Sequence, residues 1–158
     1  MLKKIIAYKN LNKFLEKIKT KTIVLAGGCF DVLHLGHLKF LEAAKKQAEI
    51  LIIALESDEN IKRSKGNNRP VNNQIIRAKN LANFDFVDFI ILLPEMKSDD
   101  DYKNLVLKMK PKVIAITEND PRLEKKKSQA KLVGTKVVEV IPYLQGYSTT
   151  KIINTNLN

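Results

Sequence analysis

The sequence predicts an α/β fold, a Rossmann-like doubly wound structure with a five-stranded parallel sheet and helices on both faces. Short apolar runs of strand length alternate along the chain with segments of helical periodicity. The first two buried runs are joined by one helical segment, which is the connection that neighbouring parallel strands require. No repeat and no low-complexity linker divides the chain, so we expect a single domain over residues 1–158.

Composition limits the class of protein. Apolar residues make up 44% of the chain, which is enough for a packed core. No run reaches the roughly 20 apolar residues that a membrane helix needs. The basic start of the chain has too short an apolar core for a signal peptide. We therefore expect a cytoplasmic protein that does not enter a membrane.

The amino-terminal half predicts an added helix and then a strand, helix, strand unit. Residues 9–19 form the added helix beside the sheet, and its apolar face carries Leu11, Phe14, Leu15 and Ile18. The apolar runs at residues 22–27 and 50–55 are the two strands, and residues 36–48 form the helix between them. We expect a right-handed crossover that leaves both strands parallel.

The second half begins with residues 60–73, which are polar and show no periodicity, so we predict a loop there that is mobile or clamps a ligand. The elements predicted after it are a helix at 72–83, a strand at 87–93, a helix from Ser98 to Lys110, a strand at 113–116, a helix at 122–133 and a strand at 136–141. The three aspartates after Ser98 are interpreted as dipole compensation at a helix start, not as a metal site.

The stretch between the first buried strand and its helix carries the chemical groups. Gly27 and Gly28 allow a tight turn and a close approach to a ligand. The helix that starts at Gly36 directs N–H groups and a positive dipole end at the carboxyl edge of the sheet, where phosphate binds in such folds. His34 and His37 are the two histidines of the sequence and stand at this helix start. The pattern predicts a phosphate site.

Two other interpretations of this stretch are less favoured. No third Cys or His lies near the histidines at the spacing of a zinc site, so we assign no metal ligands. Cys29 is interpreted as a small packing residue, not a nucleophile, because no chemistry at this position requires a thiolate.

The formal net charge of +11 indicates anionic partners. Nucleic acid would be one such partner, since clustered lysines and arginines release counterions from phosphates. The lysines of this chain are instead spread over most predicted helices, with one run at residues 125–127 and no interleaved aromatic residues. We therefore favour anionic small substrates over nucleic acid.

The motif Gly-Cys-Phe-Asp-Val-Leu-His-Leu-Gly-His at residues 28–37 resembles the signature of the nucleotidylyltransferase superfamily, whose H-x-G-H element is shared with class I aminoacyl-tRNA synthetases. Residues 65–72, Arg77 and residues 146–153 resemble, in order and spacing, the adenylyltransferase domain of bacterial ADP-heptose synthases. Glycerol-3-phosphate cytidylyltransferases are the second resemblance. They commonly carry an arginine shortly before the last motif, where this chain has Leu144 and Gln145.

The resemblance implies an HxGH nucleotidyltransferase fold and an enzyme that transfers a nucleoside monophosphate from ATP to a phosphorylated sugar resembling D-glycero-β-D-manno-heptose 1-phosphate, with release of pyrophosphate. Mg²⁺ would be bound through the substrate phosphates. One alternative is a CTP-dependent cytidylyltransferase acting on glycerol 3-phosphate or a similar polyol phosphate. A second alternative is a non-catalytic protein that binds nucleotide or RNA, and a homodimer is also considered.

The resemblance also implies roles for individual residues. Its catalytic residues would be His34, His37, Lys65 and Arg77, of which Arg77 offers a planar two-donor grip on phosphate. Its nucleotide-binding residues would be Gly27, Gly28, Cys29, Phe30, Asp31, Gly36, Asp120, Ser148, Thr149 and Thr150. The chain departs from the family pattern at residues 117–119, and of the family's segment at this place it retains only Asp120.

Overall fold

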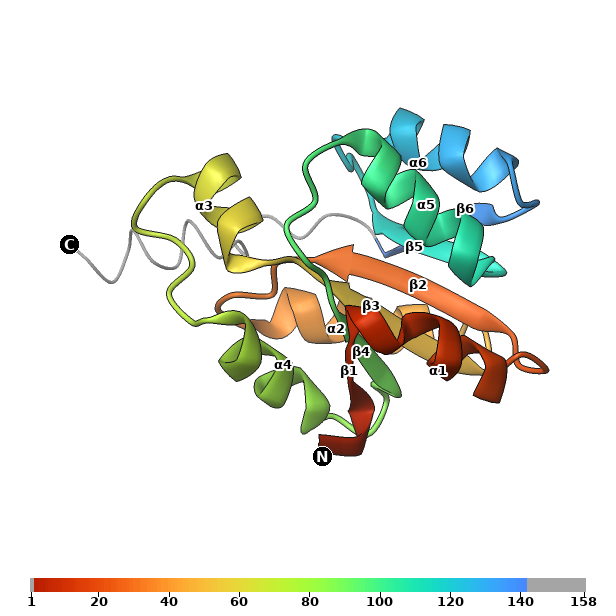
Figure 1. Cartoon of the computed structure of the whole chain (residues 1–158), viewed down its shortest axis with the longest axis horizontal. Helices are drawn as coiled ribbons and strands as arrows, with labels where there is room; N and C mark the ends of the chain where they lie inside the picture. The colour runs from red at the N-terminus through yellow and green to blue at the C-terminus, as the bar shows by residue number, and fades with distance from the viewer. Residues whose placement is uncertain (1, 142–158) are drawn as a thin grey trace.

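The computed structural model describes residues 2–141, and these form an α/β structure around one parallel sheet (Figure 1). Its strands are β1 (Ile5–Ala7), β2 (Ile23–Gly28), β3 (Ile50–Leu55), β4 (Phe89–Leu92), β5 (Val113–Thr117) and β6 (Lys136–Ile141). They lie in the order β1-β4-β3-β2-β5-β6, and every pairing is parallel. The predicted doubly wound fold class is confirmed.

The sheet has six strands, so the predicted count of five is wrong. The additional strand, β1, pairs with β4 at one edge of the sheet. It is only three residues long and lies between two short 3-10 helices, η1 (Leu2–Lys4) and η2 (Tyr8–Asn10). A strand this short shows no alternation of apolar and polar residues, which explains why the sequence pattern did not reveal it.

The helices of the described chain are α1 (Leu11–Lys17), α2 (Leu35–Lys45), α3 (Asp58–Lys65), α4 (Gln74–Ala82), α5 (Asp99–Met109) and α6 (Leu123–Lys131). Helices α1, α5 and α6 pack on one face of the sheet, and α2 and α4 pack on the other. None of the described helices is long and apolar enough to cross a membrane.

Helix α3 occupies the start of a segment that was predicted to be a loop, and this is a correction. Ser57 caps the helix by accepting a hydrogen bond from the backbone N–H of Asn60 at 3.1 Å. Asp58 and Glu59 in its first turn complement the helix dipole. Asn60 and Ile61 are its two buried residues, so the apolar periodicity that reveals longer helices is missing here.

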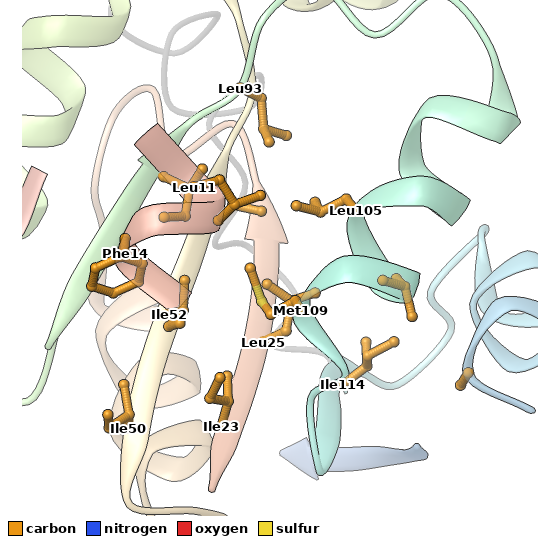
Figure 2. Close-up of a cluster of buried hydrophobic side chains, with 14 of the residues drawn as sticks. Leu11, Phe14, Ile23, Leu25, Ile50, Ile52, Leu93, Leu105, Met109 and Ile114 are labelled. Carbon is orange, nitrogen blue, oxygen red and sulfur yellow. The ribbon is translucent and has the colours of Figure 1, made fainter. Parts of the chain in front are cut away.

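Successive residues of a strand point to opposite faces of the sheet and so pack alternately into the core on either side of it. On β2, Ile23 and Leu25 face the α1, α5 and α6 side, whereas Val24 and Ala26 face the α2 and α4 side. Figure 2 shows the buried cluster on the α1, α5 and α6 side of the sheet. Leu11 and Phe14 of α1 lie on one side of this cluster and Leu105 and Met109 of α5 on the other, next to side chains of β2 and β3. Burial on both faces explains why the strands are continuous apolar runs.

The order of the strands determines where a ligand binds. From β2 the chain moves outward through β3 to β4, and it then crosses back so that β5 pairs with the other side of β2. The order therefore reverses at β2. In open parallel sheets, ligands bind outside the carboxyl ends of the strands at such a reversal, and the predicted phosphate-binding turn follows β2 directly.

Candidate active site

A cavity of about 720 Å³ opens at the carboxyl edge of the sheet. Its walls come from the end of β2 and the turn after it, from the carboxyl ends of β3 and β5, and from α3, α5 and α6. Predicted site residues that line the cavity are Gly27, Gly28, Cys29, Phe30, His37, Lys65 and Asp120. Asp31, His34, Gly36 and Arg77 are outside this lining. Ser148, Thr149 and Thr150 lie outside the described residues.

The two histidines lie together at the start of α2. His34 is the N-cap residue, and its Nδ1 accepts a hydrogen bond from the backbone N–H of His37 at 3.4 Å. The two imidazole rings stack with centroids 3.7 Å apart and planes inclined by 23°. The ring of Phe30 meets His37 edge-on at 5.3 Å. The H-x-G-H spacing thus brings both rings to the helix end where phosphate is stabilised.

Burial makes both histidines weak bases. The pKa of His37 is lowered to about 3, first by burial and then by the neighbouring His34 and Lys65. Burial also lowers the pKa of His34. Both imidazoles are therefore neutral near pH 7 in the ligand-free protein. The Nδ1 atom of His37 is buried, and no described residue forms a hydrogen bond with it.

The glycine turn after β2 is shaped by Phe30. A Cβ atom added to Gly28 would lie 2.8 Å from a ring carbon of Phe30, which is closer than real Cβ contacts. Phe30 itself is 4% exposed and adopts a positive φ of 46°. Gly28 therefore leaves room for a protein side chain at the cavity wall, and this ring in turn positions His37.

Asp31 holds the turn against the segment before α4. Its carboxylate, 1% exposed, accepts hydrogen bonds from the backbone N–H groups of Val71 and Asn72 at 2.8 and 2.9 Å. It also accepts one from Nε of Arg69 at 3.0 Å. The expected contact between Asp31 and a nucleotide does not agree with this arrangement, because the carboxylate is enclosed by protein donors.

Arg77 of α4 is completely buried, so the expectation that its guanidinium grips phosphate does not agree with the structure. Its Nε donates to the carbonyl of Asn72 at 3.0 Å, and its Nη1 to the carbonyl of Cys29 at 2.7 Å. Its Nη2 donates to the carbonyl of Glu56 at 2.9 Å and to the carboxylate of Asp58 at 2.7 Å. Arg77 thus joins the turn after β2 to the end of β3 and the start of α3.

Three further predicted residues line the cavity in different ways. Lys65, the last residue of α3, is exposed and acts electrostatically on its neighbours, since it lowers the pKa of His37. Burial raises the pKa of the Cys29 thiol, which agrees with a packing role and not a nucleophilic one. The carboxylate of Asp120 accepts hydrogen bonds from the Arg122 backbone N–H and from Nζ of Lys126, at 2.8 and 2.6 Å.

A polar cluster on the cavity wall was missed by the sequence analysis. It consists of Glu56, Asn60, Tyr102 and Arg122, which come from the end of β3, from α3, from α5 and from the residue before α6. Glu56 directly follows the second buried strand of the chain. A charged residue at the carboxyl end of a parallel strand was the signal available in the sequence.

Within residues 2–141, no group of three or more His, Cys, Asp or Glu side chains could hold a metal ion. The acid nearest to the histidines along the chain, Asp31, is already bound to protein donors. The described part of the site therefore has no ready-made cage of protein ligands for a divalent cation.

The sequence model of the family described as cytidylyltransferase-like matches residues 25–155, which include the glycine turn, the histidines and every strand from β3 onward. The chain belongs to the cytidylyltransferase-like family. Similar curated proteins carry the name bifunctional protein HldE. The relative from Campylobacter jejuni serotype O:6 is 42% identical over 139 residues, which cover 88% of this chain and 28% of that protein. The relative from Campylobacter fetus is 40% identical over 85% of this chain and 28% of that protein.

This cytidylyltransferase-like chain spans less than a third of the length of these curated relatives. Among solved structures, a lipopolysaccharide core biosynthesis protein from Thermoplasma volcanium has a TM-score of 0.67 and 24% identity, covering 78% of this chain and 99% of that one. A pantoate-β-alanine ligase from Francisella tularensis has a TM-score of 0.64 and 17% identity, covering 97% and 76%. At these identities the structures show the fold alone. The sequence match therefore shows the family, and the solved structures agree with it in fold.

Proposed function

We propose that this cytidylyltransferase-like protein transfers AMP from ATP to a phosphorylated sugar resembling D-glycero-β-D-manno-heptose 1-phosphate and releases pyrophosphate. The observation that carries the proposal is the start of α2, where His37 and the glycine turn face a cavity of about 720 Å³. Similarity to the bifunctional HldE proteins favours the adenylyl form of the reaction over the cytidylyl form.

In the proposed reaction, an oxygen of the acceptor phosphate attacks the α-phosphorus of ATP, and the bond from this phosphorus to the bridging oxygen breaks. The acceptor phosphate is already anionic, so no enzyme nucleophile is needed. The barrier lies in bringing negative groups together and in stabilising charge on the phosphoryl oxygens. Pyrophosphate leaves with the electron pair of the broken bond.

The start of α2 is suited to that task. Its unpaired N–H groups and positive dipole end would face the phosphates. His34 and His37 would donate hydrogen bonds to phosphoryl oxygens, and the arriving negative charge would raise their lowered pKa values. Lys65 would add a mobile positive charge from α3. Ser148, Thr149 and Thr150 would bind the β and γ phosphates, as the family resemblance implies.

Mg²⁺ is proposed to arrive with the nucleotide. The described residues provide no cluster of acidic, histidine or cysteine ligands for it, so the phosphate oxygens of the substrate would hold the ion. When bound, it would neutralise part of the phosphate charge.

The test is a grid of ATP, CTP, GTP and UTP against D-glycero-β-D-manno-heptose 1-phosphate, glycerol 3-phosphate and other sugar phosphates, with pyrophosphate release as the readout. We expect the highest kcat/KM for ATP with the heptose phosphate. A higher value for CTP with glycerol 3-phosphate would favour the cytidylyltransferase alternative. Nucleotide binding without pyrophosphate release from any pair would favour a non-catalytic binding protein.

A further inference from the structure

A carboxylate lies in the wall of a cavity whose proposed ligands are anions. Glu56 follows the last residue of β3, lines the cavity, and has a side chain that is 10% exposed. A buried charge next to phosphate groups would repel them. Such a residue is retained in an anion site only if it contributes something else, such as structure or the recognition of a neutral part of the ligand.

Two neighbours fix the orientation of the Glu56 carboxylate. The hydroxyl of Tyr102 donates to it and lies 2.9 and 3.0 Å from its two oxygens. Nδ2 of Asn60 donates to Oε2 at 3.1 Å. Asn60 is itself held, because its Oδ1 accepts from the backbone N–H of Met96 at 3.1 Å and from Nη2 of Arg63 at 2.9 Å. The carboxylate is therefore oriented before any ligand arrives.

Tyr102 remains a hydrogen-bond donor over the whole useful pH range. Burial, and after it the neighbouring charge of Glu56, raise the pKa of Tyr102 to about 12. Nδ2 of Asn60 also donates to the tyrosine oxygen at 2.9 Å, so the single Tyr102 proton is directed at Glu56. The carboxylate and the phenol form a fixed donor and acceptor pair.

Arg122 approaches the same carboxylate without enclosing it. Its Nη1 lies 3.7 Å from Oε1 of Glu56, which is an ion-pair distance but too long for a hydrogen bond. The Arg122 side chain is 56% exposed and lies over the Tyr102 ring at 5.7 Å. A partly exposed arginine in this position can move toward a ligand phosphate and leave the carboxylate to other donors.

The Glu56 carboxylate, which lines the cavity, can accept further hydrogen bonds. A carboxylate offers about four lone-pair sites, and among the described residues only Tyr102 and Asn60 donate hydrogen bonds to it. Neighbouring hydroxyls of a sugar or polyol are neutral donors that can bind the two oxygens together. They form charge-assisted hydrogen bonds and bring no repulsive charge of their own.

The cluster meets the glycine turn at the sheet edge, where the backbone N–H of Glu56 donates to the carbonyl of Gly28 at 3.1 Å, but its side chains come from other elements. Glu56, Asn60 and Tyr102 come from β3, α3 and α5, whereas the glycine turn and the histidines come from β2 and α2. Helices α3, α5 and α6 all contribute to the cavity wall, and the 2.9 Å hydrogen bond from Asn60 to Tyr102 joins α3 to α5. The order of the sheet reverses between β3 and β5, so Glu56 stands on the β3 side of the reversal and the segment at 117–120 on the β5 side.

We propose that Glu56, oriented by Tyr102 and Asn60, determines acceptor specificity by accepting hydrogen bonds from two neighbouring hydroxyls of the sugar part of the acceptor. This inference rests on the proposed function, because it names a subsite for the acceptor of that reaction. The nucleotide then occupies the β2 and β5 side of the cavity, and its KM does not depend on Glu56.

The first experiment compares Glu56→Gln with the wild-type protein, using ATP and D-glycero-β-D-manno-heptose 1-phosphate. Glutamine keeps the shape of the side chain but replaces one acceptor oxygen with a donor group. We expect the KM for the sugar phosphate to rise by about tenfold or more, since a site built to bind a hydroxyl discriminates strongly when a partner is lost. The KM for ATP should change by less than about twofold, within the scatter expected of uncoupled sites.

Two further variants separate recognition from folding. Glu59→Gln removes a carboxylate from an exposed position on α3 outside the cavity lining and should leave both KM values unchanged. Tyr102→Phe keeps the ring and removes the hydroxyl, so we expect a smaller rise in the sugar phosphate KM. In the wild-type protein, a monodeoxy analogue that lacks a hydroxyl bound by Glu56 should have a higher KM than the full sugar phosphate. In Glu56→Gln this difference in KM should disappear. If Glu56→Gln does not fold, the sugar phosphate KM of Tyr102→Phe decides, and a wild-type value there overturns the inference.

The outcomes distinguish this inference from the proposed function. If Glu56→Gln still turns over its substrates and its KM for the sugar phosphate equals that of the wild-type protein, the inference is overturned but the proposed function stands. A selective rise in the KM for ATP overturns it in favour of recognition of the nucleotide. If no pyrophosphate is released, calorimetric titration of the sugar phosphate into the protein with a non-hydrolysable ATP analogue takes over. Binding that Glu56→Gln weakens supports the inference without the reaction, and absence of binding to the wild-type protein overturns it.

Discussion

The stacked imidazoles of His34 and His37 are neutral because burial lowers the pKa of both, and His34 and Lys65 lower the pKa of His37 further. A neutral ring still donates one hydrogen bond to a phosphoryl oxygen, and it avoids the cost of a buried charge in the free protein. In the proposed reaction, the histidine pair would therefore offer hydrogen-bond donors to the charge that develops on the phosphoryl oxygens.

We predict that His37→Ala lowers turnover by about two to three orders of magnitude, the usual loss for one preorganised donor to a developing charge. His37 lines the cavity, whereas Lys39 lies exposed on the same helix outside it. Lys39→Ala is therefore the matched control and should keep wild-type turnover. The measurement is pyrophosphate release at saturating substrates, and unchanged turnover in His37→Ala would remove the proposed role of the H-x-G-H element.

The lowered pKa of His37 also predicts how stability depends on pH. The folded protein keeps this imidazole neutral down to about pH 3, whereas the unfolded chain protonates it near its ordinary pKa of 6.5. The unfolded state therefore binds more protons in this window, so the free energy of unfolding falls as the pH is lowered from about 6.5 toward 3. Above pH 6.5 both states are neutral and the contribution is constant.

His37→Gln should remove that dependence. Denaturant unfolding of both proteins at pH 7, 6, 5 and 4 gives the difference in their free energies of unfolding. We expect this difference to change by up to about 1.4 kcal/mol per pH unit, the limit for one proton. The carboxylates and His34 are present in both proteins and largely cancel. A difference that stays constant between pH 7 and 4 would show that His37 is not desolvated.

At the scale of elements, the site is held by buried polar contacts between segments far apart in the sequence. Arg77 of α4 donates to carbonyls at residues 29, 56 and 72, and Asp31 accepts from residues 69, 71 and 72. These contacts join the turn after β2 to the end of β3 and to the segment before α4. Backbone carbonyls buried this deeply would be costly to leave unpaired.

We predict that Arg77→Lys lowers the free energy of unfolding by about 3 kcal/mol, the scale for disrupting a buried charged network. An ammonium group cannot reproduce the planar fork that reaches four acceptors in different directions. Lys79→Arg, at an exposed position on the same helix, should change stability by no more than about 0.5 kcal/mol. Urea unfolding measures both. Stability equal to that of the wild-type protein would show that Arg77 does not hold these elements together.

Arg77 also illustrates what the sequence could predict about the site. The motif located the glycine turn, the histidines and a helix around residue 77, because these follow from spacing and periodicity. Whether the guanidinium reaches phosphate or backbone carbonyls depends on which segments fold beside it, and spacing along the chain carries no such information. The resemblance to a family supplied a role, and the buried contacts of Arg77 support a positioning role instead.

The sequence pattern missed two elements, each for its own physical reason. Strand β1 is too short for alternation to be visible, and its place at the sheet edge is fixed by pairing with β4. Helix α3 buries only two residues, so its apolar period is absent. Its capping signal was present in Ser57 followed by two acids, and weighting this signal above periodicity would have identified the helix. The cluster around Glu56 could not be predicted from the sequence, because its members come together only when α3 and α5 pack beside the end of β3.

At the scale of the whole molecule, the family match begins at residue 25, and the segment before it adds β1 and α1 to the fold. Helix α1 packs on the sheet face that α5 and α6 also cover (Figure 2). Its residues Leu11 and Phe14 are buried there at 2% and 8% exposure. The amino-terminal segment thus completes the core on that face, and it does not contribute to the cavity lining.

This division predicts that the core under α1 can be weakened without affecting substrate binding. Phe14 packs edge-on against Phe89 of β4 with ring centroids 4.7 Å apart. Phe14→Ala should lower the free energy of unfolding by about 3 kcal/mol through lost burial and the cavity left behind. Both KM values should stay at wild-type levels at temperatures where the variant is folded. Lys13→Ala, at an exposed position on α1, should change neither property. Raised KM values in folded Phe14→Ala would mean that the added segment shapes the site through the sheet, because Phe14 itself is not part of the cavity lining.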